Sequence, residues 1–302
     1  MHSIKQILIR IYEWAYEKRR LLILRVFYRL NIMSPVKTIK YIKKTGCNIA
    51  RYGDGEFDHI LNLKDEHFQK RSEALSGELQ KVLRSKNKNL LLCVPRCYNT
   101  TKGCNDHSKE FWIDWGKKDE HHKKIITLIR GYTGKNYRFG DAQITRPYID
   151  WKTTERADKT FPLLKSLWEN KDILIVEGAQ TRMGVGNDLF DGASSVKRIL
   201  TPAENAFDKY DEIKQTILDN RENRLVIMAI GPTATILACD FAEMGIQALD
   251  IGNIDIEYEW YLRKATSRIP IPGKYTNEAK EGRVFTECSD EKYLSEIITE
   301  IR

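Results

Sequence analysis

The chain has 302 residues and a mass of 35.2 kDa, which suits one large domain or two modest ones. Hydrophobic residues make up 41% of the chain and charged residues 30%, a composition typical of globular rather than disordered or fibrous proteins. Fifty lysines and arginines against 42 acidic residues give a net charge of +8 and a pI near 9.0. This balance favours an anionic partner: a phosphate-bearing small molecule, a nucleic acid or an acidic membrane surface.

The sequence argues against a membrane-spanning or secreted protein. Its longest apolar runs, Leu21–Leu24 and Leu225–Ile230, are far shorter than the roughly 20 residues that a spanning helix needs. The first twenty residues carry too many charges for a secretory signal peptide. Six cysteines in a chain of this size are not a disulfide framework, so we expect a cytoplasmic location.

Three of the cysteines, Cys93, Cys97 and Cys104, lie close to His107 and raise the question of a zinc site. Their spacing fits no common zinc-binding pattern, and Cys93 falls within a predicted strand. We therefore expect ordinary thiols here.

The first thirty residues predict a basic amphipathic helix. Apolar residues recur at helical spacing at Ile4, Ile7, Leu8, Ile11 and Ala15. The basic residues of the stretch are Lys5, Arg10, Lys18, Arg19, Arg20, Arg25 and Arg29. Two interpretations stay open: a peripheral contact of residues 1–30 with anionic lipid at the inner face of the cell membrane, or a helix packed on the body of the protein or on another subunit.

After Pro35, short apolar runs alternate with longer helical patterns. The predicted strands are Asn48–Tyr52, Asn89–Val94, Tyr137–Phe139, Asp172–Val176, Val196–Leu200, Leu225–Ile230 and Gln247–Ile251. The predicted helices lie near 71–85, 106–130, 155–169, 203–219 and 233–244. This alternation indicates an α/β fold with a mostly parallel sheet and helices on both faces. Ligands of such folds bind where strands end and loops lead into helices.

The first loop of this kind, residues 51–57, has the sequence RYGDGEF. In an extended turn, the carboxylates of Asp54 and Glu56 could converge on one hard cation such as Mn²⁺ or Mg²⁺. Gly53 permits a diphosphate to approach closely, and Arg51 adds positive charge. The alternative is a tight turn into a helix whose first turn holds Glu56 against the helix dipole.

The second loop follows the predicted strand that ends at Val176. Its backbone around Gly184, Gly186 and Asn187 could form an anion nest, with Arg182 as a bidentate phosphate ligand. We expect a helix after this loop. The loop lacks the glycine spacing of a dinucleotide site and the ending of a P-loop, so both classes are disfavoured. The alternative is a surface loop with a chance arginine.

Two further loops carry polar residues. Gly231 and Thr233 begin a predicted helix whose N-terminus suits a phosphate or a ribose, although Thr233 could equally be a plain N-cap. After the last predicted strand come four acidic residues, Asp250, Asp255, Glu257 and Glu259. They are candidates for metal ligation, sugar recognition or general base catalysis, or else form the solvated start of a helix.

Together, these motifs resemble one known family, the GT-D glycosyltransferases, first catalogued as a domain of unknown function. The similarity runs from about Ile49 to Leu262 and rests on five motifs: RYGDGEF, ITRPY, VEGAQTRMGVGNDLF, IGPTAT and DIGNIDIEYEW. Their order and length make the resemblance specific. One departure is Asn253, where we expect histidine in the family. The basic N-terminal segment lies outside the similarity.

The resemblance implies a Rossmann-like domain, a UDP-linked sugar donor such as UDP-glucose or UDP-galactose, and dependence on manganese or a similar metal through Asp54 and Glu56. It also implies transfer of a hexose to a hydroxyl of a growing surface glycan or glycoprotein glycan. Arg182 and the neighbouring glycine loop would stabilise developing negative charge. For the general base we prefer Glu257 to Asp255.

We therefore expect a basic helical extension at 1–34, a glycosyltransferase domain at 35–268 and a C-terminal appendage at 269–302, with a helix from near Ser289. The main alternative is a non-catalytic nucleotide-binding scaffold subunit of a membrane-associated glycan-assembly complex. A phosphoryl-transfer enzyme with Asp54 as nucleophile would need a nearby lysine, and Lys64 is a poor candidate. We expect no nucleic-acid partner, because the basic residues do not alternate with aromatic ones in a known module. A homo-oligomer stays open.

Overall fold

A computed structural model describes residues 29–61, 68–117, 121–282 and 287–302. Of the first 28 residues it describes only Leu8, Ile11, Tyr12, Trp14, Ala15 and Arg19. The predicted basic helix at 1–34 therefore lies mostly outside the described residues.

The described residues form one nine-stranded sheet in which every neighbouring pair of strands is parallel. Its spatial order is β1-β4-β3-β2-β8-β7-β5-β6-β9. The strands are β1 (Asn31–Ile32), β2 (Asn48–Arg51), β3 (Leu90–Val94), β4 (Arg138–Asp141), β5 (Asp172–Gly178), β6 (Ser195–Thr201), β7 (Leu225–Ala229), β8 (Ala248–Asp250) and β9 (Ile297–Glu300). All seven predicted strands are confirmed, each within two residues at either end.

Helices connect the strands and cover the sheet. They are α2 (Pro35–Thr45), α3 (Asp54–Ile60), α4 (Glu73–Arg84), α5 (Asp106–Lys117), α6 (His121–Thr133), α7 (Glu155–Lys165), α8 (Tyr210–Asn220), α9 (Pro232–Glu243), α10 (Ile254–Leu262) and α11 (Glu291–Glu296). Short 3₁₀ turns are η1 (Arg96–Tyr98), η3 (Ala142–Thr145) and η4 (Ala206–Lys209). The helix predicted near 106–130 is two helices, α5 and α6.

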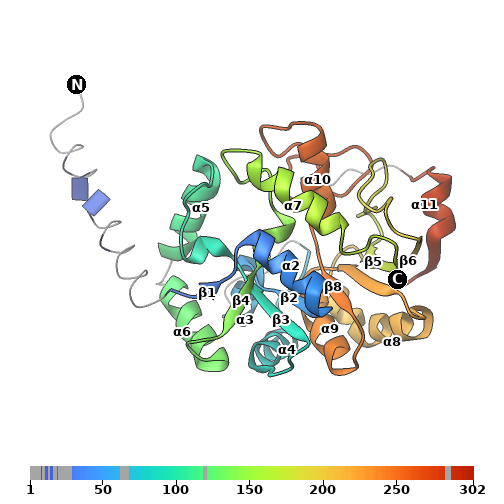
Figure 1. Ribbon diagram of the computed structural model, residues 1–302, viewed down its shortest axis with the longest axis horizontal. Helices are drawn as coiled ribbons and strands as arrows, with labels where there is room; N and C mark the ends of the chain where they lie inside the picture. The colour runs from blue at the N-terminus through green and yellow to red at the C-terminus, as the bar shows by residue number, and fades with distance from the viewer. Residues whose placement is uncertain are drawn as a thin grey trace.

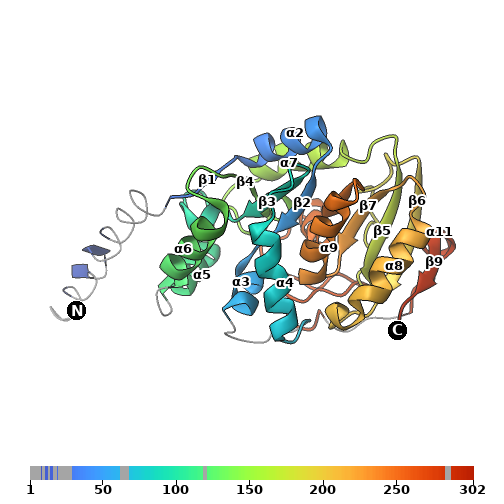
Figure 2. The same ribbon diagram turned by 90° about the horizontal axis from the view of Figure 1, so that it is seen from below.

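The helices lie in two layers, one on each face of the sheet (Figures 1 and 2). Side chains of α3, α4, α6, α8 and α9 pack into one hydrophobic cluster with alternate strand residues such as Ala50 and Leu92. Side chains of α2, α7 and α10 pack with the strand residues between them, such as Ile49 and Leu91. The central strands are buried on both faces, which explains why they are apolar throughout rather than alternating. The predicted fold class is confirmed.

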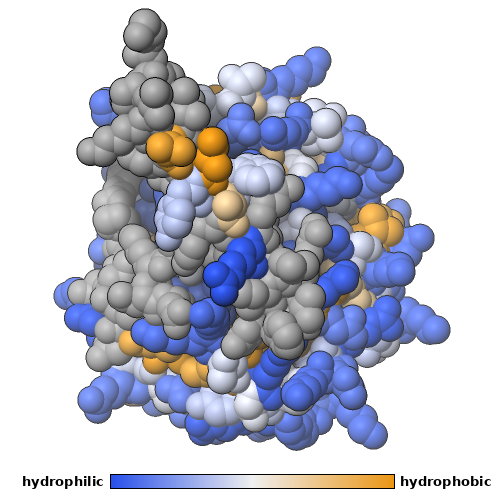
Figure 3. Space-filling view, turned by 90° about the vertical axis from the view of Figure 1, so that its left-hand side faces the viewer, coloured by the Kyte–Doolittle hydropathy of each residue, from blue (hydrophilic) through white to orange (hydrophobic). Residues whose placement is uncertain are grey.

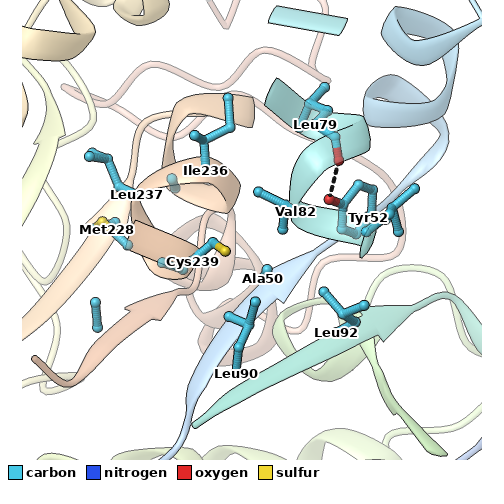
Figure 4. Close-up of a cluster of buried hydrophobic side chains, with 14 of the residues drawn as sticks. Ala50, Tyr52, Leu79, Val82, Leu90, Leu92, Met228, Ile236, Leu237 and Cys239 are labelled. Atoms are coloured by element: carbon cyan, nitrogen blue, oxygen red, sulfur yellow. Dashed lines mark hydrogen bonds between the residues drawn. The ribbon is translucent and has the colours of Figure 1, made fainter. Parts of the chain in front are cut away.

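Figure 4 shows the first of these clusters at the contact of β2, β3, α4 and α9. Tyr52 is completely buried there, and its hydroxyl donates a hydrogen bond of 2.8 Å to the carbonyl of Leu79. Because a buried phenol without a partner would cost free energy, this bond fixes how α4 lies against the end of β2.

A polar contact joins the start of β2 to the elements around β8. Asn48 is 2% exposed, and its side-chain amide donates to the carbonyls of Ala238 and Ile246, both at 2.9 Å. Its side-chain oxygen accepts from the N–H of Ala248 at 3.0 Å. One asparagine thus sets the position of β2 relative to α9 and β8.

Two connections between strands differ from expectation. The helix α2 was not predicted, although Ser34 caps it, Pro35 opens it and Gly46 ends it in the left-handed conformation. The helix expected after the loop that follows β5 is absent: residues 179–194 form turns that lead directly into β6. Arg182, Gly184 and Gly186 have φ values of 52°, 78° and 78°, which are incompatible with a right-handed helix.

The C-terminal tail does more than pack on the domain. The helix expected near Ser289 is confirmed as α11, and β9 follows it as an unpredicted edge strand beside β6 (Figure 2). Arg198 of β6 donates to Glu177 and to Glu296, both at 2.7 Å, so a buried ion-pair network holds this end of the chain in the sheet.

On the face shown in Figure 3, the described surface is mostly hydrophilic, and its hydrophobic side chains form small separate groups. Among the described helices, none is both long and apolar enough to span a bilayer.

Candidate functional site

The carboxyl ends of β2 and β8 meet at the centre of the sheet. From β2 the chain proceeds outward to β3 and β4, whereas β8 is reached from β7 on the opposite side. The loops that leave two such strands diverge, and this topological switch point is where open parallel sheets bind ligands.

A buried ion pair joins the two strands at this point. The guanidinium of Arg51, at the end of β2, donates to the carboxylate of Asp250, at the end of β8, with an Nη2–Oδ1 distance of 2.8 Å. The backbone N–H of Arg51 donates to the other carboxylate oxygen at 3.1 Å, and Nη1 donates to Thr145 of η3 at 2.7 Å. Thr235 of α9 donates to the Arg51 carbonyl at 2.9 Å and to Asp250 at 3.2 Å. Arg51 was predicted to bind the donor, but its guanidinium is held by partners within the protein.

The predicted metal-binding residues lie in the first turn of α3 rather than in an extended turn. Glu56 turns back to the N-cap residue, and its Oε2 accepts from the N–H of Gly53 at 2.7 Å. Burial raises the pKa of Glu56 to about 7, and the negative charge of Asp250 adds to the shift. Asp54 is half-buried at the start of the helix. The capping interpretation of this turn is therefore confirmed.

Both residue types suit a divalent cation, although side chains two residues apart in a helix turn point in different directions. Among the described residues, no three side chains of His, Cys, Asp or Glu are grouped as a metal site. Mg²⁺ and Mn²⁺ prefer oxygen ligands, and Mg²⁺ in particular is often held by one or two carboxylates together with substrate phosphates. In such a site Asp54 and Glu56 would be the carboxylate ligands.

At the end of β7, the chain turns sharply onto the N-terminus of α9. Gly231 has a φ of 60°, and a Cβ there would lie 2.8 Å from the ring of Phe68, so only glycine fits. Two residues on, Thr233 is completely buried, and its hydroxyl has no hydrogen-bond partner. The two predicted residues thus lie together at the start of α9, where the hydroxyl of Thr233 is unpaired.

In the loop after β5, the predicted phosphate ligands contact the protein itself. The N–H of Gly184 and the side-chain amide of Asn187 both donate to Asp255 at 2.8 Å. Arg182 is 8% exposed and donates to the carbonyl of Gly273 at 2.7 Å. Gly186 has open space around it. The donors that we expected to bind a phosphate therefore bind the carboxylate of Asp255 instead.

Lys274 is the cation at the centre of this network. Its ammonium lies 2.6 Å from Asp255 and 3.2 Å from Glu259, and all three side chains are less than 5% exposed. Both oxygens of Asp255 are engaged by donors within the protein, so we do not retain Asp255 as a general base. The role of Lys274 was not predicted from the sequence, because no local pattern distinguishes it from other lysines of the tail.

Glu257 has a different environment. It is completely buried, and its Oε2 accepts from the N–H groups of Tyr148 and Ile149 at 3.0 and 3.1 Å. Its Oε1 has no partner. Burial and the nearby charge of Asp150 raise the pKa of Glu257 to about 8, although Arg146 opposes the shift. A carboxyl group of this kind can exchange a proton near neutral pH.

Buried polar atoms without partners gather at the carboxyl edge of the sheet. They belong to Gln143 after β4, Thr233 after β7, Asn253 after β8 and Glu257 in α10. An unpaired buried polar group costs about 1–3 kcal/mol, so each of these four is a candidate contact for a polar ligand, although unpaired atoms also occur elsewhere, as in His121 and Tyr293. Asn253, which departs from the family pattern, is among them and has a left-handed φ of 70°.

The cysteines near His107 show no zinc geometry. Cys93, Cys97 and Cys104 are buried free thiols, and the Sγ atoms of Cys97 and Cys104 lie 3.5 Å apart. Within the part of the chain that the structure describes, no metal-binding group includes them.

Replacing Lys274 with methionine should lower the free energy of unfolding by about 3–5 kcal/mol, because Asp255 and Glu259 would remain buried without their cation. Urea denaturation of K274M measures the loss. The matched control, Lys292→Met, removes an exposed lysine of the same tail and should change stability by less than about 0.5 kcal/mol. Equal stabilities of the two variants would show that the buried ion pairs contribute little.

Comparison with known proteins agrees with this geometry. Residues 49–279 match the family model described as "Glycosyltransferase GT-D fold". The "Probable glycosyl transferase Gly" of Streptococcus gordonii is 34% identical over 274 residues, which are 90% of this chain and 39% of the relative. "Glycosyltransferase GlyD" of Streptococcus pneumoniae serotype 4 is 34% identical over 269 residues, 88% of this chain and 32% of the relative. The chain thus spans well under half the length of these curated relatives.

Solved structures cover almost the same extent as this chain. One, reported as a domain of unknown function 1792 with a distinct glycosyltransferase fold, superposes with a TM-score of 0.83 at 35% identity and covers 92% of this chain and 98% of its own. Another, described as a new glycosyltransferase from Streptococcus sanguinis, has a TM-score of 0.80 at 32% identity and covers 91% of this chain and 100% of its own. The fold, the site and these similarities together show that the chain belongs to the glycosyltransferases of the GT-D fold.

Proposed function

We propose that this protein transfers a hexose from UDP-glucose or UDP-galactose to a hydroxyl of a growing surface glycan or glycoprotein glycan, with Mn²⁺ or Mg²⁺ bound at Asp54 and Glu56. The proposal is supported by the family match, by the two carboxylates that follow β2, and by the unpaired buried hydroxyl of Thr233 in α9, a helix that Thr235 bonds to the end of β2. Carboxylates attract a cation and a helix N-terminus attracts phosphate, which is the pairing that a nucleotide diphosphate needs.

In this mechanism, the protein binds and orients the donor diphosphate. The N-terminus of α9 and the hydroxyl of Thr233 donate hydrogen bonds to phosphate oxygens, and Gly231 lets the backbone approach them. The Arg51–Asp250 pair fixes the end of β2, from which the chain leads into the turn that carries Asp54 and Glu56. Asp54 and Glu56 would hold a divalent cation, whose positive charge would stabilise the departing diphosphate.

The acceptor side of the site is assigned to Glu257. Its raised pKa and unpaired Oε1 suit a group that accepts the proton of the attacking hydroxyl. The amides of Tyr148 and Ile149 hold its other oxygen and set its direction. If the reaction retains the anomeric configuration, this base is not required. Asn253 precedes α10, has an unpaired side-chain amide, and would contact the sugar or the acceptor.

Replacing Asp54 with alanine should abolish metal-dependent donor binding. Calorimetry of the wild type should show UDP affinity at least tenfold higher with Mn²⁺ than with a chelator, and D54A should lose that difference. The control, Asp219→Ala, removes an exposed carboxylate on α8 and should behave as the wild type. Wild-type protein that is folded but binds no nucleotide would favour the scaffold alternative.

Replacing two threonines of α9 with valine, one at a time, should have different effects on UDP binding and on the stability of the fold. Thr233→Val removes a hydroxyl that has no partner within the protein, so the free energy of unfolding should stay within about 0.5 kcal/mol while the UDP dissociation constant rises roughly five- to tenfold. Thr235→Val removes a hydroxyl bonded to Arg51 and Asp250 and should cost about 1–3 kcal/mol of stability. If T233V binds UDP as tightly as wild type, the hydroxyl does not contact the donor.

The pKa of Glu257 predicts a pH dependence of both activity and stability. A base must be ionised, so kcat/KM should rise with pH through about 8, and Glu257→Gln should lose this rise together with most of the activity. Because the folded-state pKa is raised, folding favours the protonated form, and wild-type stability should fall as pH increases from about 4.5 to about 8. E257Q should show a smaller decline, which ends near pH 7 because the raised pKa of Glu56 still contributes. An unchanged rate profile in E257Q would remove the base assignment.

The location that we propose is the cytoplasm, at the inner face of the cell membrane, through residues 1–30. Of the described residues there, the apolar side chains of Leu8 and Ile11 are more than half exposed, as expected of a helix that contacts lipid. Deleting residues 1–28 keeps the buried Leu30 and should reduce co-sedimentation with phosphatidylglycerol vesicles at least fivefold, with UDP affinity unchanged. Equal co-sedimentation of the two proteins would leave packing on the body or on another subunit as the role of this segment.

A further inference from the structure

A second depression lies beyond the switch point, beside the ends of β3 and β4. Its volume is about 330 Å³, and its walls come from the N-terminal ends of α2 and α7, from η1 and from residues 100–103. None of the residues that we assign to the donor, the metal or the base lines it. It is therefore a separate candidate for ligand binding.

The lining of this depression is strongly basic. Arg96, Lys102, Arg156 and Lys159 contribute four positive charges, and Glu155 contributes the one negative charge, which Lys159 pairs. Arg96 and Lys102 have no acidic partner among the residues that the structure describes. Two unneutralised cations at one concave surface attract an anion.

Arg156 is held in place but not fully satisfied. Its guanidinium stacks 3.9 Å from the ring centre of Trp151, and Nη2 donates to Asp141 at 2.8 Å and to the carbonyl of Gln143 at 3.1 Å. Its Nε–H, which is buried, has no partner. A preorganised guanidinium with a spare donor is a common element of phosphate sites.

The unpaired hydroxyl of Thr160 is a second, independent indication that this depression binds a ligand. It lines the depression, its side chain is completely buried, and its hydroxyl has no hydrogen-bond partner. A threonine within a helix can satisfy its hydroxyl by bonding to a carbonyl one turn earlier, but this one does not. The hydroxyl therefore carries an unpaired donor in the wall of the depression.

The N-terminus of α7 is uncapped beside this depression, whereas that of α2 is capped by Ser34 and begins with a proline, which has no N–H. The N-cap residue of α7, Thr154, makes no capping bond, and its hydroxyl donates to Asp158 instead. The N-terminal residues of α2, Pro35 and Val36, form part of the opposite wall. Uncapped amides at a helix N-terminus favour phosphate oxygens over water.

We propose that this depression binds a phosphate group, at a site separate from the nucleotide-sugar site. Arg96, Lys102 and the spare Nε–H of Arg156 neutralise and orient the phosphate, while the N-terminus of α7 and the hydroxyl of Thr160 complete its hydrogen bonds. The volume exceeds what an inorganic ion fills and lies at the lower end of small-molecule sites, so the phosphate can be carried by a sugar-sized group.

Calorimetry on the full chain tests this, with inorganic phosphate, glucose 1-phosphate and glucose as probes at constant ionic strength, each with and without saturating UDP. Both phosphates should bind, and glucose should not. Arg96→Gln should weaken phosphate binding at least tenfold, and Thr160→Val at least threefold with an unchanged Tm. Arg221→Gln, which removes a basic residue at the opposite edge of the sheet, should bind as the wild type does.

Tighter binding of glucose 1-phosphate would identify a phosphate ester as the ligand, and equal affinities would identify the phosphate group alone; both support the site. Three results would overturn it: no binding of either phosphate, equal weakening in R221Q, or displacement of phosphate by UDP, which would place the ion at the donor site. Because R96Q leaves the switch point intact, the outcome is independent of whether UDP binds.

Discussion

The buried ion pair between Arg51 and Asp250 is the interaction on which the rest of the site depends. It joins the two strands that flank the switch point, and through Thr145 and Thr235 it also holds η3 and α9. Removing one member of such a pair leaves a buried charge without compensation, which typically costs several kcal/mol. The pair thereby holds β2, β8, η3 and α9 together. Each of these four elements lies next to a candidate ligand-binding segment. Its role is positional, because its hydrogen-bonding capacity is used within the protein.

The polar groups at this edge fall into two kinds. Some, such as Asp255 with Lys274 and Asn187, satisfy each other completely and stabilise the loop after β5 from within. Others, such as the hydroxyls of Thr233 and Thr160, are buried with no partner. Groups of the first kind are fully hydrogen-bonded without a ligand. Each group of the second kind costs free energy because it is unpaired, and a ligand that bonds to it removes that cost. This difference, more than the density of charge, separates the supporting residues from the candidate binding residues.

The family resemblance and the alternation of strands and helices were visible in the sequence because they depend on local, regularly spaced residues. Buried parallel strands are apolar on both faces, so runs such as Leu225–Ile230 predict them directly. The same local reasoning overlooked α2, although its capping serine, proline and glycine were present, and it placed a helix after Gly186. It also missed β9, because a four-residue edge strand is defined by its pairing with β6 rather than by its own composition.

The sequence by itself determined the fold class, the positions of the central strands along the chain, and which polar residues follow those strands. Only the tertiary structure decided what each polar residue does, because that depends on partners distant along the chain. Asp255 is neutralised by Lys274 from the tail, Arg51 by Asp250 from a strand 199 residues away, and the depression beside β4 is formed by four separate segments. Strand and helix patterns are local properties of the chain, whereas the pairing of charges and the loss of solvent are properties of the folded molecule.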